Sequence, residues 1–191
     1  MRSMPWRNGG GITHEIAAGP EGASLDGFDW RLSMAEVASD GPFSVFAGVD
    51  RTLTLLAGDG ISLDFGGGDV SLRPGSDPLA FPGEAPVTGR LHAGPILDLN
   101  VMTRRGAARH AVAVLPVGAP LPPDCIAIVC RSGQVRIGAE TLAPGDCALL
   151  YADPDTTNAP STILTAGSGE IVAVSLWGMD DSRNSRENRS I

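Results

Sequence analysis

Glycine and proline break this chain into short segments, and that punctuation constrains its fold more than any other feature. The 191 residues include 25 Gly and 15 Pro, and only 19% are charged. Between the breaks, apolar and polar residues alternate, as in Trp30–Met34 and Ile61–Phe65. A period of two buries one face of a strand, whereas such frequent breaks do not suit long helices. The sequence therefore predicts an all-β fold.

Other segments share this strand character, and most are separated by Gly, Pro or Asp turns. They lie at 12–17, 52–57, 70–73, 86–92, 96–102, 110–115, 125–130, 134–137, 147–151, 162–165 and 171–177. The polar residues 179–191 offer no apolar face to bury, so we expect this tail to be disordered.

The strand pattern repeats along the chain. Leu53–Gly58 corresponds to Ile126–Gly133, and Leu72–Gly75 corresponds to Leu142–Gly145. Two such units predict a duplicated barrel. The prolines within 115–123 suit an extended connector. We assign the first unit to residues 1–114 and the second to 115–178, with strands exchanged between them, and the tail to 179–191.

Charge and composition exclude several classes of function. A net charge of -8 and a pI near 4.7 oppose binding to nucleic acid. The chain contains no lysine, which excludes Schiff-base chemistry and a P-loop. No apolar run approaches the roughly 20 residues that span a bilayer, so we expect a cytoplasmic protein with no membrane partner. The three cysteines lie in apolar runs and are expected to be buried thiols.

Three predicted strands carry two polar residues at i and i+2, with apolar residues on most of the opposite face. The pairs are Thr13/Glu15, Arg31/Ser33 and Asp98/Asn100. In an ordinary sandwich such faces meet water. If the strands are neighbours, however, the pairs converge on one patch that suits a small ligand with several hydrogen-bonding groups.

Arg31 ranks first among the candidate ligand-binding residues. Its planar guanidinium matches a carboxylate in a bidentate way, which predicts a small acidic ligand. The alternative is a structural ion pair with Glu15 or Asp98.

The stretch Met4–Gly11 precedes the first of these strands and contains Trp6, Asn8, Gly9 and Gly10. Three consecutive glycines allow close approach of the backbone to a ligand. A flexible turn is the alternative reading of the glycines.

The sequence does not favour a metal site or a catalytic triad. His14, His92 and His110 are scattered, with no close pair of ligands. The remaining route to a metal is His92 with a pocket carboxylate. No serine lies in a Gly-x-Ser-x-Gly elbow. We therefore expect neither a metal nor any other cofactor.

Four sequence stretches together resemble the HutD family, which includes the Ves-like proteins. They are Met4–Ile16, Asp29–Ala35 with Gly41–Ser44, and Asp98–Met102. The resemblance implies a bicupin of two RmlC-like cupin β-barrel repeats. It also implies an association with bacterial histidine utilisation and a pocket for an intermediate such as formylglutamate.

The family pocket maps onto the motif positions, with Phe81 and Pro82 as walls. The positions are Trp6, Asn8, Gly9, Gly10, Thr13, Glu15, Arg31, Ser33, Asp98 and Asn100.

Two departures from the family pattern affect these expectations. Family members usually have a further strand before Met-Pro-Trp, so one barrel edge is expected to be short or differently paired. The cupin His-x-His signature is also absent, which argues against a metal-dependent reaction.

Three hypotheses about function follow. The first is a regulatory or accessory protein, not an enzyme, that binds a small acidic metabolite. The second is a metal-independent isomerase or hydrolase in which Glu15 or Asp98 is the general base. The third is an interaction module whose strand edges join subunits, for example as a homodimer.

Overall fold

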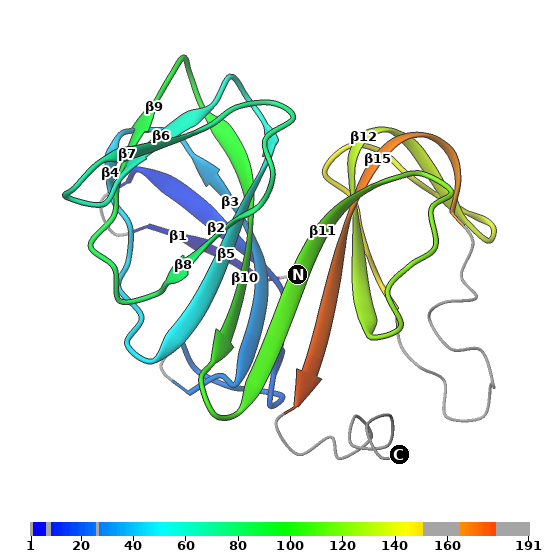
Figure 1. The fold of residues 1–191 in the computed structure, drawn as a ribbon, viewed down its shortest axis with the longest axis horizontal. Coiled ribbons are helices and arrows are strands. Elements are labelled where there is room, and N and C mark those ends of the chain that lie inside the picture. The colour runs from blue at the N-terminus through cyan, green and yellow to red at the C-terminus, as the bar shows by residue number, and fades with distance from the viewer. Residues whose placement is uncertain (1, 7–8, 26, 151–164, 179–191) are drawn as a thin grey trace, which may run out of the picture.

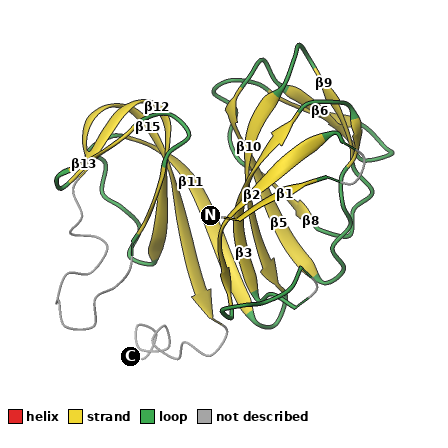
Figure 2. Ribbon diagram, turned by 180° about the vertical axis from the view of Figure 1, so that it is seen from behind, coloured by secondary structure: helices red, strands yellow, loops and turns green. Residues whose placement is uncertain are grey.

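The computed structural model describes residues 2–6, 9–25, 27–150 and 165–178, and every helix or strand assigned in them is a β-strand (Figure 2). This confirms the all-β prediction. The strands are β1 (Arg2–Pro5), β2 (Gly11–Gly19), β3 (Trp30–Val37), β4 (Gly41–Pro42), β5 (Val49–Ala57), β6 (Ile61–Asp64), β7 (Asp69–Leu72), β8 (Leu79–Pro82), β9 (Thr88–Leu91), β10 (Ile96–Arg104), β11 (Ala108–Pro116), β12 (Cys125–Ile137), β13 (Glu140–Leu142), β14 (Cys147–Leu149) and β15 (Thr165–Gly178).

The strands before residue 105 form two antiparallel sheets, here called the N-terminal unit. One sheet has the order β1-β2-β3-β10-β5-β8, and the other β4-β9-β6-β7. An apolar core lies between them, and its members include Leu53, Leu55 and Ile96 from the first sheet and Ile61 and Leu63 from the second. Among the described strands no ladder closes either sheet into a barrel, so the two closed barrels implied by the resemblance are not confirmed.

The strands from Ala108 onward form a third sheet, here called the C-terminal sheet. Its order is β11-β15-β12-β13, with β14 also paired to β12. Strand β11 pairs with β15 along its whole length, from Ala108↔Gly178 to Pro116↔Glu170. In both overall views β11 is the strand of this sheet drawn nearest the N-terminal unit (Figures 1 and 2).

A second apolar cluster joins the N-terminal unit to the C-terminal sheet. Leu32 and Met34 of β3 and Leu99 and Val101 of β10 contribute from one side. From the other side, β12 and β15 contribute Ala127, Val129, Val172 and Val174. The outward faces of β3 and β10 are therefore buried by the second half of the chain and do not meet water.

The repeat seen in the sequence has a structural counterpart in two turns. In the first, Ser76 N donates to Arg73 O at 2.9 Å, and Gly75 has φ +88°. In the second, Asp146 N donates to Ala143 O at 2.9 Å, and Gly145 has φ +90°. Glycine adopts such positive φ values without the strain that a Cβ introduces.

Most predicted strand segments coincide with observed strands. The segments 125–130 and 134–137 form one continuous strand, β12, because Gly133 (φ +76°) continues the ladder with β15. Four edge strands, β1, β4, β8 and β13, were not predicted, since their two to four residues show no clear alternation of apolar and polar side chains. Most of 162–165 and the whole tail lie outside the described residues. No helix capable of crossing a bilayer occurs in the described part of the chain.

The apolar cluster between the N-terminal unit and the C-terminal sheet predicts the effect of shortening one of its side chains. We expect Leu99→Ala to destabilise the protein by about 2–5 kcal/mol, because Leu99 is fully buried and its removal leaves a cavity. Urea unfolding followed by circular dichroism measures this. The matched control is Leu25→Ala, at a leucine that is 46% exposed, which should change stability by less than about 0.5 kcal/mol. Equal effects of the two substitutions would contradict the assignment of this junction.

Candidate functional site

Strand register brings the predicted polar pairs together on one face. Glu15 is opposite Ser33 across β2 and β3, and Ser33 is opposite Asn100 across β3 and β10. This face lines a cavity of about 550 Å³, a size usual for small-molecule sites. The cavity is lined by Met4, Pro5, Trp6, Thr13, Leu25, Arg31, Ser33, Ala35, Pro42, Phe43, Ser44, Phe46, Arg51, Asp98, Asn100 and Met102. We call it the polar pocket.

Arg31 is 4% exposed and is held by two neighbours. Its Nε donates to Glu15 Oε2 at 2.8 Å, and its Nη1 donates to Ser33 Oγ at 3.3 Å. The ion pair with Glu15, foreseen as an alternative role, is thus present. Glu15 itself does not line the polar pocket. Arg31 Nη2 takes part in none of the hydrogen bonds between described residues, so one edge of the guanidinium is free to meet a ligand.

A chain of buried polar groups runs through Arg51, Asn100 and Asp98. Arg51 Nε donates to Asn100 Oδ1 at 2.8 Å, and Arg51 Nη2 donates to the same oxygen. Asn100 Nδ2 in turn donates to Asp98 Oδ1. The Arg51 guanidinium also lies over the rings of Phe43 and Phe81, 4.9 and 5.4 Å from their centroids. Phe81 therefore backs Arg51 and does not itself line the polar pocket.

Asp98 is fully buried, and its Oδ2 has no hydrogen-bond partner among the described residues. Burial raises the pKa of this carboxyl from 3.8 to about 7, against the opposing effects of Arg51 and Asn100. Burial also lowers the pKa of Arg51 to about 10; Asp98 opposes this shift, and nearby Arg31 adds to it. Arg51 remains charged near pH 7, while Asp98 is only partly ionised.

Trp6 and the glycine run form one edge of the polar pocket. Trp6 Nε1 donates to Thr13 Oγ1 at 2.8 Å, which fixes the indole over the pocket. Gly11 makes room for this ring, since a Cβ there would lie 2.3 Å from Glu36 O and 3.2 Å from the indole. Gly9 and Gly10 lie in the turn and do not line the pocket. Asn8 lies outside the described residues.

Arg51 is the main pocket residue that the sequence analysis missed. The predicted strand began at residue 52, whereas β5 begins at Val49. Alternation places Arg51 on the same face as Leu53 and Leu55. The sequence did contain a sign of this: a charged residue shares one strand face with two core leucines, which indicates that this face passes from the core into a pocket.

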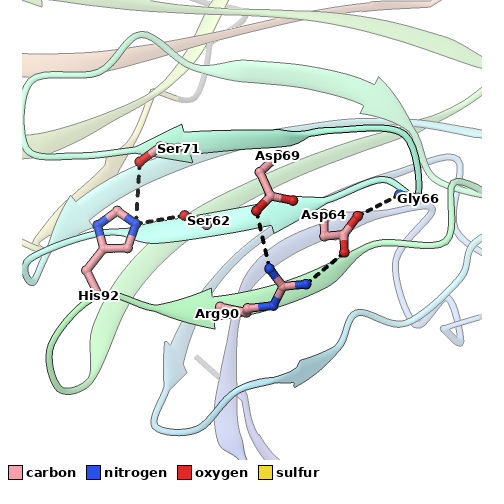
Figure 3. A network of polar contacts seen from close by, with 7 residues as sticks. All are labelled: Ser62, Asp64, Gly66, Asp69, Ser71, Arg90 and His92. Carbon is pink, nitrogen blue, oxygen red and sulfur yellow. Dashed lines mark hydrogen bonds and ion pairs between the residues drawn. The ribbon is translucent and has the colours of Figure 1, made fainter.

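The histidines are held separately and do not converge on the polar pocket. His14 contacts Ser3 Oγ at 2.9 Å and Glu36 Oε1 at 3.0 Å. His92 Nε2 lies 2.9 Å from Ser62 Oγ and 3.4 Å from Ser71 Oγ, beside the Arg90 ion pairs with Asp64 and Asp69 (Figure 3). His92 is thus not brought to a pocket carboxylate. Within the described residues, no three His, Cys, Asp or Glu side chains are grouped so as to hold a metal.

Comparison with known proteins identifies the family. A model of the HutD family matches residues 1–168. This chain belongs to the HutD family. HutD from Pseudomonas fluorescens SBW25, solved in a formate condition, has the same fold, with a TM-score of 0.74 and 29% identity over 93% of this chain and 94% of that one. A conserved protein of unknown function from Pseudomonas aeruginosa PAO1 gives a TM-score of 0.71 and 29% identity over 92% and 93%.

Curated relatives match this chain over a shorter stretch than the two solved structures do. An uncharacterised 21.2 kDa protein in the hutC 3′ region of Pseudomonas putida is 46% identical over 99 residues, which are 52% of each chain. Protein Ves of Cronobacter sakazakii is 43% identical over 118 residues, or 60% of this chain and 64% of Ves. The match therefore spans about half to two thirds of the length of these relatives.

The raised pKa of Asp98 predicts how stability depends on pH. The folded carboxyl binds its proton more tightly than the unfolded one, so its contribution is fully present below pH 4 and is lost as pH rises toward 7. Asp98→Asn removes this dependence. We expect the variant to gain on the order of 4 kcal/mol relative to wild type between pH 4 and pH 8, since a change of one in the pKa is worth about 1.4 kcal/mol. Urea unfolding of both proteins at several pH values measures the difference, and a difference independent of pH would contradict the buried, protonated carboxyl.

Proposed function

We propose that this HutD-family protein binds a small acidic metabolite in the polar pocket, and that its role is regulatory or accessory. A ligand resembling formylglutamate, from histidine degradation, is the specific form of the proposal. The relative in the hutC 3′ region supports a link with histidine utilisation, since its name places it beside a hut gene.

The observation that carries the proposal is that two buried guanidiniums, of Arg31 and Arg51, have between them only one carboxylate in an ion pair among the described residues, that of Glu15. Glu15 neutralises Arg31 at 2.8 Å. Arg51 has only Asn100, a neutral amide, and Asp98, whose burial favours its uncharged form. A buried positive charge with no ionised partner is unfavourable. A bound carboxylate would supply the missing charge.

The remaining hydrogen-bonding groups suit a ligand with two kinds of polar end. Arg31 Nη2 and Arg51 Nη1 are donors not used between described residues, and they suit a carboxylate. Asp98 Oδ2 is unpartnered and buried. It can donate to a carbonyl when protonated or accept from an amide N–H when ionised. An N-acyl amino acid with a carboxylate carries both groups.

The bicupin arrangement belongs to the same proposal. We infer that residues 1–114 and 115–178 descend from one duplicated cupin-type unit, as the matched turns at Gly75 and Gly145 support. In this arrangement the first unit contains the polar pocket, and the second covers the outer faces of β3 and β10.

A thermal-shift assay tests the binding proposal. A ligand at a hundred times its dissociation constant should stabilise the protein by about 2.7 kcal/mol. We expect N-formyl-L-glutamate to raise the melting temperature, and its diamide, which lacks both carboxylates, to leave it unchanged. Formate and formiminoglutamate complete the panel. If no carboxylate in the panel raises the melting temperature, the proposal is wrong.

The matched variants in that assay are Arg51→Met and Arg73→Ala. Arg51→Met keeps the length of the buried side chain and removes its charge, so the shift should disappear. Arg73→Ala removes an exposed arginine remote from the pocket lining and should keep the full shift. Circular dichroism shows whether each variant is folded. The diamide comparison on wild-type protein decides the charge requirement even if Arg51→Met does not fold.

A metal-independent hydrolase or isomerase is the second candidate, favoured by Asp98 alone. A buried carboxyl with a pKa of about 7 and a free oxygen suits general acid–base catalysis near neutral pH. Glu15, the other base considered, is occupied by Arg31. If this candidate is correct, incubation with N-formyl-L-glutamate gives product, and Asp98→Asn lowers the rate by at least about a hundredfold. Absence of turnover in wild-type protein rules this reaction out.

A further inference from the structure

A second cavity, here called the junction groove, lies on the side of the N-terminal unit that faces the C-terminal sheet. Its volume is about 560 Å³. Arg51 of β5 lines both cavities, with its guanidinium donating to Asn100, whereas the next residue, Thr52, lines the junction groove and not the polar pocket. The groove walls include Thr52, Thr103, Pro82, Arg109, His110 and Trp177.

His110 lines the junction groove and is fixed at both ring nitrogens. Thr52 Oγ1 lies 2.8 Å from Nε2, and Thr103 Oγ1 lies 2.8 Å from Nδ1. Burial lowers the pKa of His110, although Asp50 opposes this, so the ring is neutral near pH 7. A neutral imidazole donates from one nitrogen and accepts at the other. One threonine hydroxyl therefore accepts from His110 and keeps its own O–H to donate to a ligand.

The junction groove is lined by a positively charged side chain, Arg109, that has no acidic partner among the described residues. The Arg109 side chain is exposed and takes part in no hydrogen bond or ion pair between the described residues. The nearby Asp50 carboxylate is already held by Arg105 Nη1 at 2.8 Å. The Arg51 guanidinium is directed away, toward Asn100.

An aromatic ring stands beside this cation. Arg109 and Trp177 are register partners across β11 and β15, so they are direct neighbours on the two strands. Trp177 is half-buried and lines the groove together with Pro82 and Phe81. The groove thus combines an apolar wall, an adjacent guanidinium and hydroxyls held by an imidazole.

We propose that the junction groove binds a small planar aromatic carboxylate. Arg109 binds the carboxylate, as its fork geometry favours. Trp177 packs against the aromatic ring, and a threonine hydroxyl beside His110 donates to the ligand. The two cavities share Arg51, but this proposal does not depend on the function of the polar pocket, because Arg109, Trp177 and the threonines line the junction groove alone.

Nuclear magnetic resonance of the tryptophan indole groups tests this proposal with benzoate as the probe. The chain has three tryptophans. Trp6 lines the polar pocket and Trp177 lines the junction groove, so the two cavities report separately. Trp→Phe variants assign the ¹⁵N–¹H signals. We expect benzoate to shift the Trp177 signal in a saturable way and to leave the Trp6 signal in place.

Two comparisons test the role of charge. Benzamide, the neutral analogue, should bind about tenfold more weakly, as the loss of a charge-assisted hydrogen bond implies. Arg109→Ala should weaken benzoate binding by a similar factor, whereas Arg136→Ala, at an exposed arginine elsewhere on the C-terminal sheet, should leave it unchanged. The proposal is overturned if Trp177 does not respond, if Trp6 alone responds, or if Arg109→Ala binds benzoate as tightly as wild type.

Discussion

Burial of strand β10 on both faces is the constraint on which the rest of the structure depends. Its inward residues Asp98 and Asn100 face the polar pocket, and its outward residues Leu99 and Val101 pack against the C-terminal sheet. A strand in this position has no solvent-facing side on which to place polar groups. Each polar residue on it must therefore find a partner inside the protein, and Asp98 Oδ2 finds none among the described residues.

The two halves of the chain have different tasks under this constraint. The C-terminal sheet covers the apolar faces of β3 and β10 with Val129, Val172 and Val174. The opposite face of the same strands packs into the apolar core at Val37 and Ile96, and it lines the polar pocket at Ser33, Asp98 and Asn100. Packing of the second half thus holds in register the strands that carry Arg31, Asp98 and Asn100.

Part of this arrangement follows from the sequence alone. Alternation in Trp30–Met34 and in Asp98–Met102 predicted both strands and the polar pairs that now lie opposite each other. It did not show which face is inside, because an apolar face buried at a junction looks the same as one buried in a core. The ion pair between Arg31 and Glu15 and the role of Arg51 depend on distances between strands that are far apart in the chain, and a local pattern carries no such distances.

The protonation state of Asp98 tests the central claim most directly, since the charge argument for an acidic ligand depends on it. Carbon-detected nuclear magnetic resonance can follow the Asp98 side-chain carboxyl carbon during a pH titration, with Asp98→Asn to assign the signal. We predict a midpoint near pH 7 in the free protein and a higher midpoint when N-formyl-L-glutamate is bound, because a neighbouring anion favours the neutral acid. A carboxyl that is fully ionised at pH 5 and insensitive to the ligand would contradict this prediction.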